Sequence, residues 1–105
     1  MTHDEGRFTV YWPRSERQTQ RKALARRPAS LEGKTVGFLW DVLFRGDEVF
    51  AILEEGLRER FPNMRFLDWR EFGNTHGSDE REVIGALPAR LEALGVDAVV
   101  SAMAA

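Results

Sequence analysis

The chain has 105 residues, of which 43% are hydrophobic and 30% charged, and this length and composition are typical of one globular domain. No apolar run approaches the roughly 20 residues that a membrane helix needs, and residues 1–6 lack the basic start and apolar stretch of an export signal. These features exclude a membrane-spanning protein, and we expect a cytoplasmic one with no membrane partner.

The chain contains no cysteine, which excludes disulfides, thiolate metal sites and a cysteine nucleophile among its own residues. His3 and His76 are far apart in the sequence, so no pair of histidines has the spacing of metal ligands, and we expect no metal site. Neither a Walker loop nor a Gly-x-Gly-x-x-Gly fingerprint occurs. No motif therefore implies a cofactor, and the cofactor stays unknown.

The charges are distributed unevenly. Residues 1–34 hold eight Lys/Arg against four Asp/Glu, whereas residues 35–105 hold seven against thirteen. The basic segment 21–27 lacks interleaved aromatic residues and any nucleic-acid-binding motif, so we expect no nucleic-acid partner. A basic extension of this kind more often packs on an acidic protein surface.

Residues 1–30 show no helical or strand periodicity except in the segment 8–12, Phe-Thr-Val-Tyr-Trp, which Pro13 ends. This pattern predicts an extended basic arm with one aromatic patch. Because Trp12 is costly to leave in water, we expect it to dock on a partner.

From Leu31 onward the pattern is that of a folded domain. The apolar, β-prone segment 35–40 predicts a first core strand. Apolar residues then recur at helical spacing over residues 47–61 and predict a helix. Residues 64–69 alternate imperfectly between apolar and polar, which predicts a second strand.

Residues 73–78 form a loop by composition. Ser78 or Asp79 can cap a helix whose apolar face runs to Leu94, and Pro88 predicts a kink or a restart inside it. The nearly uniform apolar segment 97–103 predicts a third strand that is buried on both faces of a parallel sheet.

The order strand, helix, strand, helix, strand predicts an α/β fold: a βαβαβ half of a doubly wound, parallel, three-layer sheet. We expect residues 1–30 to be the arm and residues 31–105 to be a half-domain that a partner chain completes. Because the last strand needs cover on both faces, the isolated chain is expected to be oligomeric, molten or insoluble.

Ligands of open α/β sheets collect beyond the carboxyl ends of the strands. Asp41 follows the first strand and His76 follows the second, so we predict that these two side chains are catalytic and move protons. The residues predicted to bind the substrate lie in the same two loops or end the first strand: Arg45, Asn74, Thr75, Ser78 and Trp40. Residues of these types also build turns, helix caps and cores, and that interpretation stays open for each of them.

Four segments, residues 31–39, 44–50, 72–77 and 95–101, together resemble the N-terminal half of the UGSC family of (seleno)proteins. The resemblance covers about residues 28–105. It implies that the third strand runs into a Cys-Gly-Ser-Cys or selenocysteine-Gly-Ser-Cys motif, followed by the second half of the domain. These 105 residues hold no such motif, so we expect either that a second polypeptide supplies it, which we favour, or that a selenocysteine UGA codon has been read as a stop.

The resemblance implies the small subunit of a hetero-oligomeric, split enzyme that acts on a small molecule by redox chemistry or by carbon–heteroatom bond cleavage. In this hypothesis the partner subunit brings the thiol or selenol, this chain brings the loops of the substrate pocket, and the chain alone is inactive. The alternative is a non-catalytic interaction or regulatory module that docks on an α/β partner through its last strand and its arm.

Overall fold

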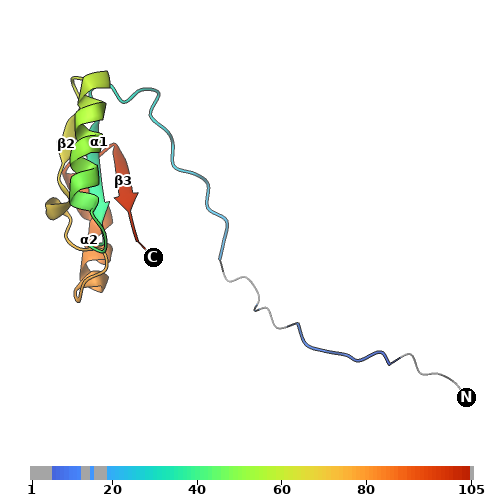
Figure 1. The fold of residues 1–105 in the computed structure, drawn as a ribbon. Coiled ribbons are helices and arrows are strands. Elements are labelled where there is room, and N and C mark those ends of the chain that lie inside the picture. Colours follow the sequence, from blue (N-terminus) through green and yellow to red (C-terminus); the bar gives the residue numbers. More distant parts are fainter. Residues whose placement is uncertain (1–5, 13–14, 16–18, 105) are drawn as a thin grey trace, which may run out of the picture.

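The computed structural model describes residues 6–12, 15 and 19–104. Its elements follow in the order β1 (Thr35–Trp40), α1 (Gly46–Arg60), β2 (Arg65–Leu67), the short 3₁₀ helix η1 (Trp69–Glu71), α2 (Glu80–Ala93) and β3 (Ala98–Ala102) (Figure 1). The three strands form one parallel sheet in the order β2-β1-β3. The predicted α/β class and the predicted alternation of strands and helices are therefore confirmed.

Three local predictions need correction. The second strand is only three residues long, and Trp69 lies in η1 rather than at the strand's end. The Asp68 carboxylate causes this change of structure, because it accepts a hydrogen bond from the Arg70 amide at 2.8 Å and caps the 3₁₀ turn. Of the kink or restart predicted at Pro88, the restart does not occur, because α2 runs through the proline as one helix: a proline deletes only one backbone donor, and the flanking turns hold the helix together.

The core lies between α1 and one face of the sheet. Phe38 and Trp40 of β1 and Phe50 of α1 are all buried and form one cluster. The Phe38 and Phe50 rings lie 4.8 Å apart, and the Trp40 ring meets the Trp69 ring edge-on at 4.7 Å. Val100 and Ala102 of β3 pack against the cluster, which therefore ties α1 to the central strand and to one edge strand.

The other face of the sheet is covered by α2, but only loosely. Successive strand residues point to opposite faces, so Gly37 and Leu39 face away from α1, and Gly37 lies against the Phe72 ring, where a Cβ would come within 3.0 Å of it. No residue of α2 is buried, and Ile84 is 47% exposed. The two helices thus lie on opposite faces of the sheet, one packed tightly and one not.

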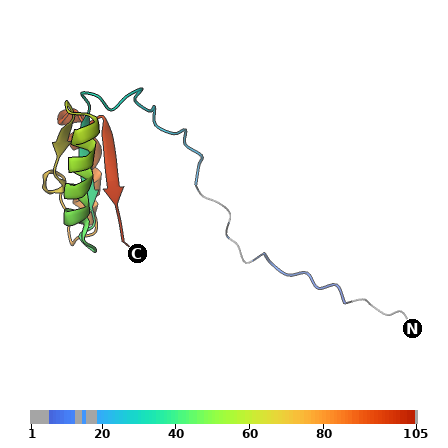
Figure 2. The ribbon, with the colours of Figure 1, turned by 45° about the horizontal axis from the view of Figure 1, so that its top comes forward.

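The prediction that the third strand is buried on both faces is wrong for the described chain. Residues of β3 alternate between partly buried and exposed, and Val99 is 38% exposed. The reason is the sheet order, which makes β3 an edge strand, together with the loose cover by α2 on the face that Val99 and Ser101 share. Figures 1 and 2 show β3 at this edge.

Two aspartates fasten β3 to β1 at opposite ends. At the start of the pair, the Asp97 carboxylate accepts a hydrogen bond from the Thr35 amide at 3.0 Å, and the Asp97 amide donates to the Thr35 carbonyl at 2.9 Å. At the far end, the Asp41 carboxylate accepts from the Ala104 amide at 2.8 Å. The register between the two strands is therefore fixed by side chains as well as by the ladder.

The described residues of the arm, 6–12, 15 and 19–30, contain no helix or strand, as predicted, and the arm leads away from the α/β body (Figures 1 and 2). Its large apolar side chains are exposed, Trp12 by 76% and Tyr11 by 99%. Docking of Trp12 on a partner stays a prediction. Within the described part of the chain, no helix combines the length and the hydropathy needed to cross a membrane.

Gly46, the first residue of α1, offers a test of how tightly this end of the core is packed. A Cβ at Gly46 would lie 2.5 Å from the Trp40 Nε1 atom, which is buried and has no hydrogen-bond partner among the described residues. Gly46→Ala should therefore lower the free energy of unfolding by about 1–3 kcal/mol through overpacking. Gly56→Ala in the same helix meets open space and should instead raise it by about 0.5–1 kcal/mol. Urea denaturation of both variants measures the difference, and equal midpoints would contradict the packing described here.

Candidate functional site

A cleft opens where the carboxyl ends of β1 and β3 lie side by side. The connection through α1 leads from β1 to β2 on one face of the sheet, and the connection through α2 leads from β2 past β1 to β3 on the other face. The strand order therefore reverses between β1 and β3, which is where doubly wound folds bind ligands. The cleft has a volume of about 600 Å³. Residues of β1, α2 and β3 and of the segments that follow β1, precede α2 and follow β3 line it: Leu39, Asp41, Leu43, Thr75, His76, Glu80, Ile84, Leu87, Ser101, Met103 and Ala104.

Asp41 lies at the base of the cleft and is only 4% exposed. One carboxylate oxygen accepts from the Leu43 amide at 3.2 Å, and the other accepts from the Ala104 amide at 2.8 Å. The side chain thus holds both its own loop and the residue that follows β3. Backbone donors on both oxygens offset the cost of burying this carboxylate.

The loop after Asp41 is strained. Val42 has φ +63°, a left-handed conformation that is a genuine outlier for a β-branched residue. The two hydrogen bonds of the Asp41 carboxylate hold this turn in place. Strain of about 1–3 kcal/mol at such a position persists only where the surrounding structure fixes it, and it is common beside binding sites.

The loop that carries His76 is attached to the end of β1. Both the amide and the hydroxyl of Thr75 donate to the Trp40 carbonyl at 3.2 Å, and Asn74 forms a parallel bridge with Trp40. The Asn74 side-chain oxygen accepts from the His76 amide at 2.9 Å. Asn74 and Thr75 therefore position the histidine.

His76 and Glu80 stand together at the mouth of the cleft. The His76 Nδ1, in the turn before α2, and a carboxylate oxygen of Glu80, the first residue of α2, lie 3.8 Å apart, and both side chains are about half exposed. The pair is an ion pair when the imidazole is protonated. Sequence reasoning missed Glu80, although its place at the start of the predicted helix, four residues after a candidate catalytic histidine, was the signal.

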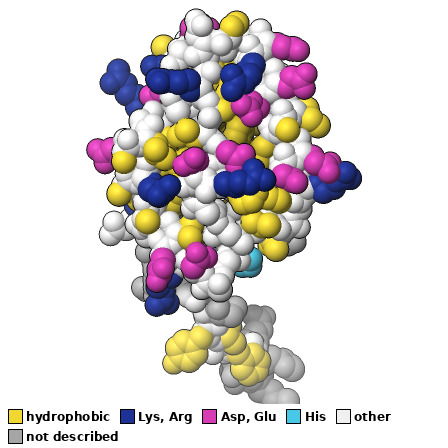
Figure 3. Space-filling view, turned by 90° about the vertical axis from the view of Figure 1, so that its left-hand side faces the viewer, with side chains coloured by type: hydrophobic (Ala, Val, Ile, Leu, Met, Phe, Trp, Pro, Cys, Tyr) yellow, Lys and Arg dark blue, Asp and Glu magenta, His cyan; other side chains and the backbone are white. Residues whose placement is uncertain are grey.

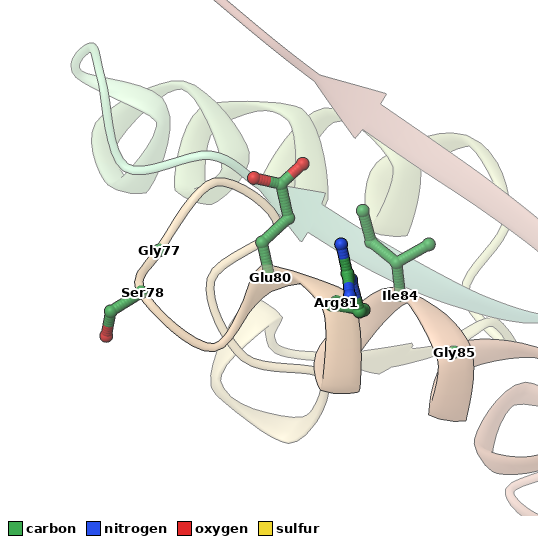
Figure 4. A pocket seen from close by; sticks show the side chains of 6 residues that line it. All are labelled: Gly77, Ser78, Glu80, Arg81, Ile84 and Gly85. Atoms are coloured by element: carbon green, nitrogen blue, oxygen red, sulfur yellow. The ribbon is translucent and has the colours of Figure 1, made fainter.

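Asp41, Thr75 and His76 are the predicted site residues that the fold brings together around the cleft. Trp40 is buried in the core instead. Arg45 is exposed and pairs with Glu48 at 2.7 Å. Ser78 lines a neighbouring hollow that shares Glu80 and Ile84 with the cleft, and its side chain points away from Glu80 (Figure 4).

Within residues 6–12, 15 and 19–104, no group of three or more histidine, cysteine or acidic residues could hold a metal ion. The face in Figure 3 shows basic and acidic side chains interspersed. That face carries no large patch of one sign.

The model of the UGSC family matches residues 9–105 of this chain. The match therefore includes much of the extended arm as well as the α/β body. No curated protein and no solved structure matches the chain.

Asp41→Ala should release the two amides that the carboxylate holds. An unpaired amide costs about 1–3 kcal/mol, so hydrogen exchange at Ala104 and Leu43 should become at least about tenfold faster. Asp97→Ala is the matched control, because it frees the Thr35 amide at the opposite end of the same strand pair. Exchange at Ala104 that is unchanged in Asp41→Ala, or equally fast in Asp97→Ala, would show that Asp41 does not hold this end.

Proposed function

Because the chain belongs to the UGSC family, we propose that it is the small subunit of a split thiol- or selenol-dependent enzyme that acts on a small molecule. The subunit contributes the cleft at the ends of β1 and β3. In this proposal a second polypeptide contributes the Cys/Sec-Gly-Ser-Cys motif, and these 105 residues, which contain no cysteine, contribute no thiol. The reducing cytoplasm suits such chemistry, because it keeps thiols free.

The observation that carries this proposal is the place of Ala104. In the family that the sequence resembles, the thiol motif follows the third strand, and Ala104 lies just beyond β3. Its amide is bound to Asp41 at 2.8 Å, and the residue itself lines the cleft beside His76. A thiol or selenol that continues the path of β3 would therefore enter the cleft next to an imidazole.

His76 is the proton carrier in this proposal. Its imidazole takes the proton of the thiol or selenol, and Glu80 stabilises the imidazolium through the 3.8 Å pair. In carbon–heteroatom cleavage, the thiolate or selenolate forms a bond to carbon as the bond to the heteroatom breaks, and the imidazolium returns the proton to the leaving heteroatom. Asp41, with hydrogen bonds to both oxygens, positions the chain for this step.

The origin of the thiol motif can be read from DNA. An ordinary stop codon followed by a separate reading frame that encodes such a motif supports the split enzyme. A UGA codon after Ala105, followed in frame by codons for Gly-Ser-Cys, would replace the split with a single selenoprotein chain.

His76→Ala tests the proposed proton transfer. In a complex with the subunit that carries the motif, iodoacetamide should alkylate the thiol or selenol about 100-fold more slowly when His76 is removed, within the range of general base catalysis. His3→Ala, which removes the only other histidine, should leave the rate unchanged. A rate that does not respond to His76→Ala would remove the histidine from the mechanism.

A non-catalytic docking module is the second candidate, and the exposed edge of β3 favours it. In this case Val99→Asp should abolish association with the α/β partner, while His76→Ala and Asp41→Ala leave the partner's turnover intact. Pull-down and turnover measured on the same samples separate the two functions. Turnover lost with association retained in the His76 variant would exclude the docking module.

Deletion of residues 1–27 tests the arm. The exposed aromatic side chains of the arm, Trp12 among them, should bury on the partner, so the truncated chain should bind at least about tenfold more weakly. Circular dichroism should show an unchanged sheet. Equal affinity of the full and truncated chains, measured by calorimetry, would show that the arm takes no part in docking.

A further inference from the structure

The side walls of the cleft are apolar, whereas one end of it carries carboxylates. Leu39 of β1, Ile84 and Leu87 of α2, and Met103 after β3 form apolar walls. Asp41 and Glu80 place two carboxylates at the end where the strands finish. A ligand that fits both parts has an apolar body and one polar end.

The charges at this end select against anions. No lysine or arginine lines the cleft in the described chain. Arg45, the cation nearest in sequence to Asp41, is exposed and pairs with Glu48. Arg81 does not line the cleft itself but lines the neighbouring hollow, which shares Glu80 and Ile84 with the cleft (Figure 4). His76 is the one basic side chain of the lining, and Glu80 already faces it.

We propose that this cleft binds small molecules with a branched aliphatic body and a cationic amine end, and that it rejects carboxylates and phosphates of the same shape. The amine pairs with the accessible Glu80 carboxylate and is attracted at longer range by the buried charge of Asp41, and the aliphatic body lies between Leu39 and Leu87. Attraction between unit charges is strong at a partly dry site, and an anion there would meet two carboxylates without a partner cation. The inference names the substrate class of the site in the proposed function and rests on that site.

Three probes of one shape test the preference: isopentylamine, isopentanol and isocaproate, titrated separately into the full isotopically labelled chain near neutral pH. The amide resonances of Asp41, Thr75, Glu80 and Ser101 should shift with isopentylamine, with a Kd at least about tenfold lower than for isopentanol. Isocaproate should bind more weakly than isopentanol. No partner subunit and no turnover enter this measurement, so its failure leaves the thiol-dependent function standing, and the converse also holds.

Variants of the lining locate the effect. Glu80→Gln should reduce the ratio of the isopentanol Kd to the isopentylamine Kd by at least about threefold. Glu82→Gln, on the same helix but outside the cleft, should leave this ratio unchanged. Ser101→Lys places a cation on the exposed face of β3 in the lining and should reverse the preference toward isocaproate. Equal binding of the three probes, tighter binding of isocaproate to the unaltered chain, or shifts confined to residues outside the cleft would each overturn the inference.

Discussion

The pairing of β1 with β3 is the constraint on which the rest of the structure depends. Five residue pairs form the ladder, and Asp97 and Asp41 bind backbone amides at its two ends. Each of these hydrogen bonds spans more than sixty residues of sequence, so together they bring the two halves of the chain into one register. Without this pairing the loop after β1 and the segment after β3 would not meet, and the cleft would not exist.

The two faces of the sheet are built differently, and the difference locates the site. On the α1 face, aromatic rings from β1, α1 and η1 pack at separations of 4.7–4.8 Å and leave little space. On the α2 face, Gly37 lets Phe72 approach the sheet near the start of β1, while no residue of α2 is buried. The cleft lies on this loosely covered face, where side chains of α2 and β3 remain in contact with solvent. The tightly packed α1 face therefore supports the loosely covered α2 face, as in other proteins whose binding sites are held by a rigid scaffold.

The site also shows how positioning and chemistry are divided among its residues. Asp41, Asn74 and Thr75 use their polar atoms on the backbone and fix the two loops. His76 and Glu80 are exposed enough to meet a ligand. The strained Val42 lies between the base of the site and the start of α1. The loops are thus held by buried or partly buried hydrogen bonds, while the groups suited to proton transfer lie at the surface.

Local patterns in the sequence determined the secondary structure and the fold class. Three patterns depend only on neighbours within a few residues: the helical spacing of apolar residues from Val49 to Phe61, the β-prone run at 35–40, and the alternation of strand and helix segments along the chain. The elements that these patterns predict are present. The rule that ligands gather beyond the carboxyl ends of strands placed Asp41 and His76 at one edge, where the cleft is found. Only the tertiary structure decided that β3 lies at the edge, that Trp40 turns into the core, that Arg45 pairs with Glu48, and that Glu80 rather than Ser78 faces the cleft. The physical reason is that strand order, helix rotation and side-chain direction depend on contacts between residues far apart in the chain, which no local periodicity encodes.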